Sequence, residues 1–95
     1  MKRILTAWVC DYFHLGHLRL FKQAKMYGNC LIVAVQDGDY ILKYKPNSDI
    51  KYTTSERIEL IEALKCVDKV DVYKNVDEYV FDNIDNFDVF AVGED

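Results

Sequence analysis

The chain has 95 residues, of which 51% are hydrophobic and 29% are charged, and its net charge is −4. This length fits one domain, and the composition is typical of globular rather than disordered proteins. The acidic balance argues against nucleic-acid binding, which favours a basic face, and no apolar run approaches the roughly 20 residues of a membrane span.

Short apolar runs alternate with segments of helical periodicity in the first part of the chain. The pattern predicts a strand over Arg3–Cys10 and a helix over His14–Tyr27. Gly28 and Asn29 provide the stop signal of that helix. Cys30–Val35 is apolar throughout, which is typical of a strand buried on both sides of a parallel sheet.

A long connection, Gln36 to Tyr52, separates this strand from the next predicted helix. Thr53 and Glu56 have the spacing of a capping box, which predicts a helix over Glu56–Lys65. A short strand over Lys69–Tyr73 follows.

The last predicted helix begins at Asn75, which can cap it together with Glu78. Its apolar stripe is expected to consist of Val76, Val80, Ile84 and Phe87. A fourth strand over Asp88–Val92 completes a β-α-β-α-β-α-β order. This order predicts a Rossmann-like α/β fold with a parallel sheet, right-handed crossovers and helices on both faces. Ligands bind such sheets beyond the carboxyl ends of the strands, which points to Trp8–His17.

Charge and cysteine content add two expectations. Residues 1–45 carry a net charge of +4 and residues 46–95 carry −8, so an anion-binding site is expected in the first half. The odd number of cysteines, Cys10, Cys30 and Cys66, argues against a disulfide framework and for a cytoplasmic protein.

Both histidines of the chain, His14 and His17, fall on the turn between the first strand and the first helix. Three residues apart on a first helical turn, their rings can converge on one point. Gly16 between them lets a bulky group approach the backbone. Free amides at a helix start suit a phosphate, and two imidazole N–H donors could stabilise charge that develops on it. Two ordinary partly buried histidines, or a zinc site of Cys10, His14 and His17, are the alternatives.

The motif His14-Leu15-Gly16-His17, preceded by Asp11 and placed after the first strand, resembles the H-x-G-H signature of the cytidylyltransferase-type nucleotidyltransferases. The resemblance extends along nearly the whole chain, through Ser55-Glu56-Arg57 to the strand that ends in Gly93-Glu94-Asp95. Within the family it is greatest to members that act on glycerol 3-phosphate.

The resemblance implies that a phosphomonoester oxygen attacks the α-phosphate of CTP, with Mg²⁺ assistance. Pyrophosphate leaves and a CDP-alcohol forms, without a covalent enzyme intermediate. Two alternatives stay open within the family: a member that acts on another phospho-alcohol, and an adenylyltransferase that uses ATP in place of CTP.

The family pattern also implies roles for individual residues. His14, His17 and Lys45 would be catalytic. The second substrate's phosphate would contact Lys43, Arg57 and Lys65, where relatives have an arginine at the position of Lys65. No residue is expected to be a metal ligand. The residues assigned to the nucleotide are Val9, Cys10, Asp11, Gly16 and Asp95.

The chain departs from the family pattern in three places. Trp8 stands where the family has a glycine and Cys10 where it has a phenylalanine, so either the indole turns away from the nucleotide or the pocket is altered. Residues 1–95 are expected to form one nucleotidyltransferase domain that lacks the family's C-terminal segment. A truncated, non-catalytic relative that serves as a nucleotide-binding or oligomerisation module is therefore the second hypothesis. An exposed edge strand in a short domain gives a physical motive for a homodimer, which is a further hypothesis.

Overall fold

The computed structural model describes residues 2–9, 15–47 and 50–91. The strands are β1 (Arg3–Trp8), β2 (Cys30–Gln36), β3 (Lys69–Tyr73) and β4 (Val89–Phe90), and the helices are α1 (Leu15–Lys25), α2 (Gly38–Tyr44), α3 (Thr54–Glu62) and α4 (Val76–Asp82). The strands form one sheet in the order β3-β2-β1-β4, and each neighbouring pair is parallel. The predicted parallel α/β fold is confirmed.

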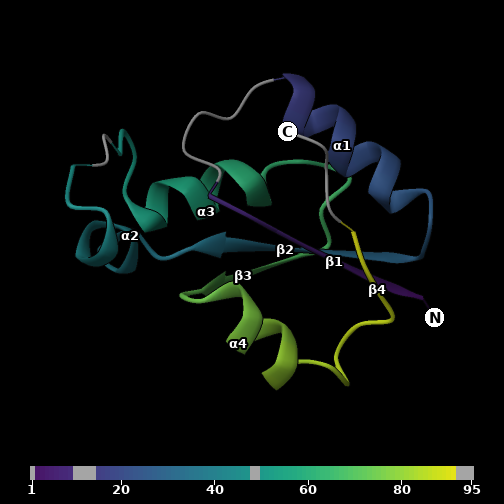
Figure 1. The fold of residues 1–95 in the computed structure, drawn as a ribbon. Coiled ribbons are helices and arrows are strands. Elements are labelled where there is room, and N and C mark those ends of the chain that lie inside the picture. Colours follow the sequence, from purple (N-terminus) through teal and green to yellow (C-terminus); the bar gives the residue numbers. More distant parts are fainter. Residues whose placement is uncertain (1, 10–14, 48–49, 92–95) are drawn as a thin grey trace.

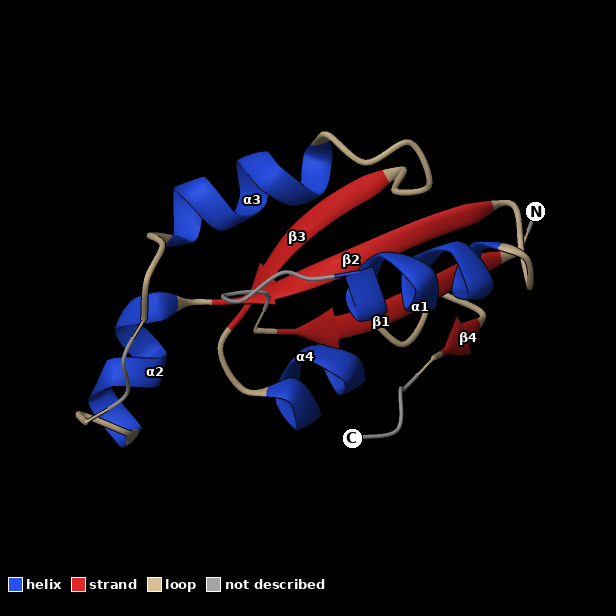
Figure 2. Ribbon diagram, turned by 90° about the horizontal axis from the view of Figure 1, so that it is seen from above, coloured by secondary structure: helices blue, strands red, loops and turns tan. Residues whose placement is uncertain are grey.

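Helices cover both faces of this sheet, as predicted. Figure 1 shows α1 and α3 on one face and α4 on the other, and Figure 2 shows α2 beyond the end of β2. Side chains alternate along β1, so that Ile4 points to the α1 face and Leu5 to the α4 face. The core on the α1 side consists of Ile4, Phe21, Ala24, Leu31, Val33, Val35 and Ile61. The smaller core on the α4 side consists of Leu5, Ile32, Ala34 and Tyr73.

The second strand is buried on both faces, as its uninterrupted apolar sequence predicts. All five residues of β2 from Leu31 to Val35 are buried. Strand β2 pairs with β1 on one side and β3 on the other, so its backbone bonds are satisfied inside the sheet. Within the described residues, no helix is long and apolar enough to cross a bilayer.

Side-chain caps set where three of the helices begin. The predicted capping box is present, because Thr53 accepts from the Glu56 N–H at 3.1 Å and Glu56 accepts from the Thr53 N–H at 2.9 Å. Asn75 accepts from the Glu78 N–H at 3.1 Å and caps α4, also as predicted. Asp37 caps α2 in the same way.

The long connection from Gln36 to Tyr52 contains a helix that was not predicted, α2. Asp37 satisfies the start of the helix and Ile41 buries its side chain. The helix has only seven residues and one buried side chain, so its sequence shows no apolar stripe.

The predicted apolar stripe of the last helix was also wrong. Helix α4 ends at Asp82, so Ile84 and Phe87 lie beyond it. The Asn83 side-chain amide donates to the Tyr79 carbonyl at 2.9 Å, which satisfies the last turn and lets the chain change direction. Phe87 then packs on the α4-side core, whereas Ile84 is 58% exposed.

Replacing Gly28 with alanine is expected to destabilise the fold by about 1–3 kcal/mol, the usual cost of overpacking. A Cβ at Gly28 would lie 2.5 Å from the Lys2 carbonyl oxygen and 2.9 Å from the Ile4 side chain. That carbonyl already accepts from the Asn29 and Cys30 N–H groups, so it cannot move without breaking them. Urea denaturation of the two proteins measures the difference, and an unchanged midpoint would contradict it.

Asp68 is expected to make the stability of the fold depend on pH. The hydrogen bond from Lys25 and the one from the Leu31 N–H lower the pKa of Asp68, although partial burial opposes the shift. A lowered pKa contributes stability above the unfolded-state pKa, and that contribution is lost as the pH falls through the folded-state pKa.

Asp68→Asn should therefore lower the free energy of unfolding at pH 7 by less than about 1 kcal/mol, because the carboxylate is partly exposed. The difference between the two proteins should shrink as the pH falls through the lowered pKa of Asp68 in the folded state, because the protonated carboxyl no longer carries the charge that Asn lacks. Denaturant titration over a series of acidic pH values measures this, with Glu59→Gln on the exposed side of α3 as the control. A difference that does not change with pH would show that charge is not the cause.

Candidate active site

The edge of the sheet where the strands end carries the candidate site. The chain adds β2 and then β3 on one side of β1, and it returns to add β4 on the other side. The strand order therefore reverses between β1 and β4. Open α/β sheets bind ligands at this switch point, beyond the carboxyl ends of the strands. Helices α2, α3 and α4 begin at the same edge (Figure 2). The positive dipole ends of helix starts favour an anion here.

Trp8 and His17 meet at this edge. His17 lies in the first turn of α1, and its ring centroid is 5.6 Å from that of Trp8, with an interplanar angle of 74°. The Trp8 indole N–H donates to the Thr6 hydroxyl at 2.6 Å. The indole also packs on the α1-side core. The side chain that replaces the family's glycine is thus fixed against one of the two predicted catalytic histidines.

Arg57 connects the carboxyl ends of β1 and β2 through hydrogen bonds. Its side chain is fully buried, and its Nη1 donates to the carbonyls of Val9 and Gln36, both at 2.7 Å. Its Nη2 donates to the Thr54 hydroxyl at 3.2 Å. These bonds hold the residues that follow β1 and end β2 against the start of α3. Arg57 therefore holds Val9, the residue that follows β1, in place.

Gly38 and Thr54 complete this support, and the sequence analysis did not single out either residue. The Thr54 hydroxyl accepts from the Gly38 N–H at 2.9 Å, which joins the starts of α2 and α3. A Cβ at Gly38 would lie 3.1 Å from Arg57 Nη2 and 3.2 Å from the Thr54 hydroxyl. A glycine directly after a strand and an aspartate cap is the sequence signal that could have revealed this close approach.

The structure brings several of the predicted residues to one edge. Val9 and Gly16 lie on either side of the connection between β1 and α1, and both are exposed. Lys43 and Lys45 lie at the carboxyl-terminal end of α2, where both are exposed and Lys43 Nζ lies 5.5 Å from the Tyr44 ring centroid. The predicted residues Cys10, Asp11, His14 and Asp95 lie outside the described residues.

Two of the residues predicted to hold the substrate phosphate are placed differently. The Arg57 guanidinium is buried and bound to protein oxygens, so the structure gives it a positioning role in place of substrate contact. Lys65 follows the end of α3, close to where the Asp68 N–H donates to the Leu31 carbonyl at the start of β2. It therefore lies toward the opposite edge of the sheet from His17.

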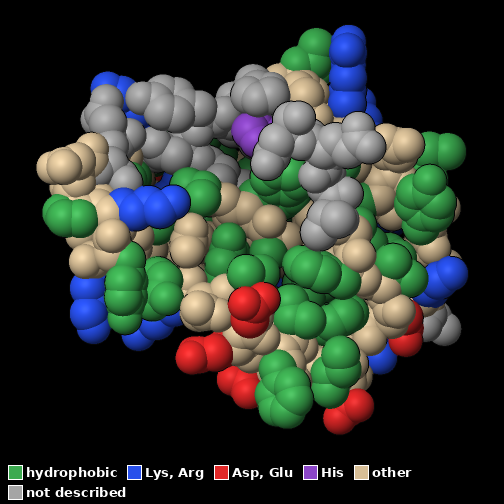
Figure 3. All heavy atoms as spheres, in the orientation of Figure 1, with side chains coloured by type: hydrophobic (Ala, Val, Ile, Leu, Met, Phe, Trp, Pro, Cys, Tyr) green, Lys and Arg blue, Asp and Glu red, His purple; other side chains and the backbone are tan. Residues whose placement is uncertain are grey.

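A cavity of about 510 Å³ opens on the α4 side of the sheet, next to the ends of β1 and β4. Its lining is mainly apolar and includes Ala7, Tyr73, Val80 and Phe90. Figure 3 shows that hydrophobic side chains dominate this part of the surface and that acidic side chains interrupt them. Such a lining suits an uncharged group and not a phosphate, so the anion is expected on the α1 side of the edge.

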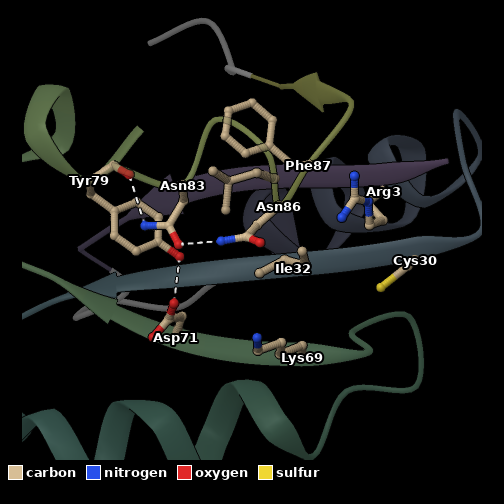
Figure 4. Close-up of a pocket in the computed structure, with 10 residues that line it drawn as sticks. Arg3, Cys30, Ile32, Lys69, Asp71, Tyr79, Asn83, Asn86 and Phe87 are labelled. Carbon is tan, nitrogen blue, oxygen red and sulfur yellow. Dashed lines mark hydrogen bonds between the residues drawn. The ribbon is translucent and has the colours of Figure 1, made fainter. Parts of the chain in front are cut away.

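A second cavity, of about 290 Å³, lies toward the other edge of the sheet (Figure 4). Arg3, Cys30 and Lys69, the first residues of three strands, are among its lining. The Tyr79 hydroxyl donates to the Asp71 carboxylate at 2.7 Å. Burial raises the pKa of Tyr79, and the hydrogen bond to Asp71 raises it further. The hydroxyl therefore stays a neutral donor that anchors α4 to β3, and this cavity is not part of the candidate site.

The described residues contain no group of three or more His, Cys, Asp and Glu side chains that could hold a metal ion. The alternative zinc site of Cys10, His14 and His17 has two of its three ligands outside the described residues, so it stays a prediction. Mg²⁺ is often bound mainly through substrate phosphates and water, and it needs no protein cage of this kind.

Comparison with known proteins supports the family resemblance of the His14–His17 motif. A family model described as Cytidylyltransferase-like matches residues 9–95. The chain is 33% identical over 96 residues to a glycerol-3-phosphate cytidylyltransferase of Bacillus subtilis (strain 168). The aligned region covers 100% of this chain and 73% of that protein. It is 34% identical over 95 residues to an FAD synthase of Thermococcus kodakarensis, and the aligned region covers 98% of this chain and 62% of that protein.

Among solved structures, the lipopolysaccharide core biosynthesis protein from Thermoplasma volcanium GSS1 is similar in fold. It aligns with a TM-score of 0.83 at 26% sequence identity, over 100% of this chain and 76% of that one. The residues matched by the family model include Gly16 and His17, together with the whole connection that leads to them from Val9.

Proposed function

Because this chain belongs to the cytidylyltransferase-like family, we propose that it transfers a cytidylyl group from CTP to a phospho-alcohol that resembles glycerol 3-phosphate. Nucleotidyl transfer is the chemistry that the family and its relatives support. The observation that carries the proposal is the position of His17, at the start of α1 and beside the end of β1, where α/β sheets bind ligands.

The proposed reaction joins the two substrates through the α-phosphorus of CTP. A phosphate oxygen of the phospho-alcohol forms a bond to that phosphorus, and the bond from the α-phosphorus to the bridging oxygen breaks. The electron pair leaves with pyrophosphate, and a CDP-alcohol remains. In phosphoryl transfer of this kind, catalysis consists of positioning and charge stabilisation.

His17 would donate an imidazole N–H to the phosphate oxygens on which negative charge develops. The helix dipole adds positive potential at the same place, because His17 lies in the first turn of α1. His14 is the proposed second donor, on the family pattern of the motif. The backbone of Val9 and Gly16 would border the triphosphate, and Cys10, Asp11 and Asp95 keep their proposed roles at the nucleotide.

Lys43 and Lys45 are proposed to contact phosphates from α2. Both side chains are exposed, and α2, which carries them, lies beyond the end of β2 (Figure 2). Lysine is a compact charge on a long stem, so it can reach a phosphate without a fixed geometry. Mg²⁺, when bound with the triphosphate, would offset charge on the leaving pyrophosphate.

The FAD synthase relatives favour one alternative, the transfer of an adenylyl group from ATP. FAD contains an adenylyl group joined to a flavin phosphate, so the acceptor would again be a phosphomonoester. A non-catalytic nucleotide-binding module, a cytoplasmic location and a homodimer stay predictions.

Two measurements on the 95-residue chain test the proposal. Calorimetric titration with CTP and with ATP, each in the presence of Mg²⁺, establishes which nucleotide binds. Pyrophosphate release is then followed with CTP and glycerol 3-phosphate, and the CDP-alcohol is identified by chromatography. We expect binding and turnover with CTP. Binding of ATP alone would favour the adenylyl alternative, and nucleotide binding without any product would favour the non-catalytic module.

A further inference from the structure

We propose that Trp8 positions the His17 imidazole for catalysis, and that the buried Thr6 hydroxyl holds Trp8 in place for this purpose. The inference rests on the proposed function, because His17 is assigned to the transferred phosphate there. It gives a role to a side chain that the family pattern does not have at this position.

The anchor of this arrangement is Thr6, in the middle of the central strand. Thr6 is 1% exposed and pairs with Val33 of β2, so its backbone is held inside the sheet. Its hydroxyl accepts the indole N–H at 2.6 Å. That N–H is the only hydrogen-bond donor of a tryptophan side chain, so this bond fixes the rotation of the ring. Thr6 and Trp8 are two residues apart on a strand and point to the same face.

The contact from the indole to His17 transmits this order to the candidate site. The centroid separation of 5.6 Å and the angle of 74° are those of an edge-to-face pair, which is a preferred arrangement of aromatic rings. The backbone of His17 is fixed by α1, and the indole restricts where its ring can turn. An imidazole that must meet a phosphate oxygen at hydrogen-bond distance benefits from such restriction, because small displacements of a catalytic group are costly.

A purely structural role for Trp8 would give different results. Trp8 also packs on the α1-side core, so any substitution can change stability. A core residue would affect the melting temperature and leave the turnover of the folded protein unchanged. A positioning residue would change kcat, with little effect on the KM for CTP.

The test uses Thr6→Val, which removes the acceptor but keeps the shape of the side chain, and Thr6→Ser, which keeps the acceptor. Trp8→Phe keeps a ring without the N–H, and it serves as the second variant should Thr6→Val fail to fold. We expect Thr6→Val and Trp8→Phe to lower kcat about 10-fold and to change the KM for CTP less than about 3-fold. Thr6→Ser should have the kcat of the wild type.

The contact itself is measured by NMR, without turnover. The ring current of the indole should shift the His17 carbon-bound proton resonances, which are assigned by their loss in His17→Gln. In Thr6→Val these resonances should move toward the positions of an unstacked histidine, and in Thr6→Ser they should not.

The outcomes separate this inference from the proposed function. Unchanged kcat and unchanged His17 resonances in a folded Thr6→Val protein would overturn the positioning role. A wild-type chain that releases no pyrophosphate and binds neither nucleotide would overturn the proposed function, and the resonance shifts would still decide whether Thr6 and Trp8 order His17.

Discussion

Replacing His17 with alanine is expected to lower kcat for pyrophosphate release about 10²–10³-fold, the usual cost of removing one donor to a developing oxyanion. The imidazole would contribute most in the transition state, where charge on the phosphate oxygens is greatest, so the affinity for CTP should fall much less. The measurement is steady-state turnover with varied CTP, together with calorimetric binding of CTP to both proteins.

Arg19→Ala is the matched control for this variant. Arg19 is exposed on the same helix and carries a positive charge, two residues beyond His17. Its removal tests whether general loss of positive charge on α1 explains the effect. Turnover that falls equally in the two variants, or that does not fall in His17→Ala, would contradict the role assigned to His17.

Replacing Arg57 with methionine is expected to destabilise the fold by about 3 kcal/mol, because the Val9 and Gln36 carbonyls would lose a charged donor that is itself buried. The methionine side chain fills part of the space but cannot donate to the Val9 and Gln36 carbonyls. For a domain of this size, such a loss lowers Tm by roughly 12–24 °C. Thermal unfolding followed by circular dichroism measures the change.

Arg57→Lys provides a graded comparison, because it keeps the charge and loses the planar fork that reaches three acceptors at once. Its Tm should fall between those of the wild type and Arg57→Met. Glu59→Ala, an exposed change on the same helix, should leave Tm nearly unchanged. A wild-type Tm in Arg57→Met would show that the two strand ends are held by other contacts.

Most of the fold could be predicted because most of its helices and strands carry a local signal in the sequence. The apolar run of β2 and the caps at Thr53 and Asn75 each depend on residues within a few positions of one another. The bounds of β3 agree with the predicted ones. Helix α2 was not predicted because its single buried side chain, Ile41, gains its environment from tertiary packing and not from periodicity.

The candidate site was predictable only in part, for a related reason. The spacing of His14 and His17 is local, and it can be seen in the sequence. The function of Arg57 depends on acceptors 48 and 21 residues away, at Val9 and Gln36, and no local pattern indicates them. Lys65 was predicted at the site but lies away from it. Helix α3 returns to the amino edge of the parallel sheet, so the residues that follow it lie far from the carboxyl ends of the strands.

The pairing of β1 with β4 has a consequence for synthesis of the chain. Strand β1 forms near the amino terminus, yet one of its two neighbours consists of Val89 and Phe90, and Arg3 also contacts Asp88. A nascent chain can join β1 to β2 early, but the other side of β1 stays open until Val89 and Phe90 have left the ribosome. Until then an unpaired strand border is available to other chains, so crowding of partly synthesised copies should favour their aggregation.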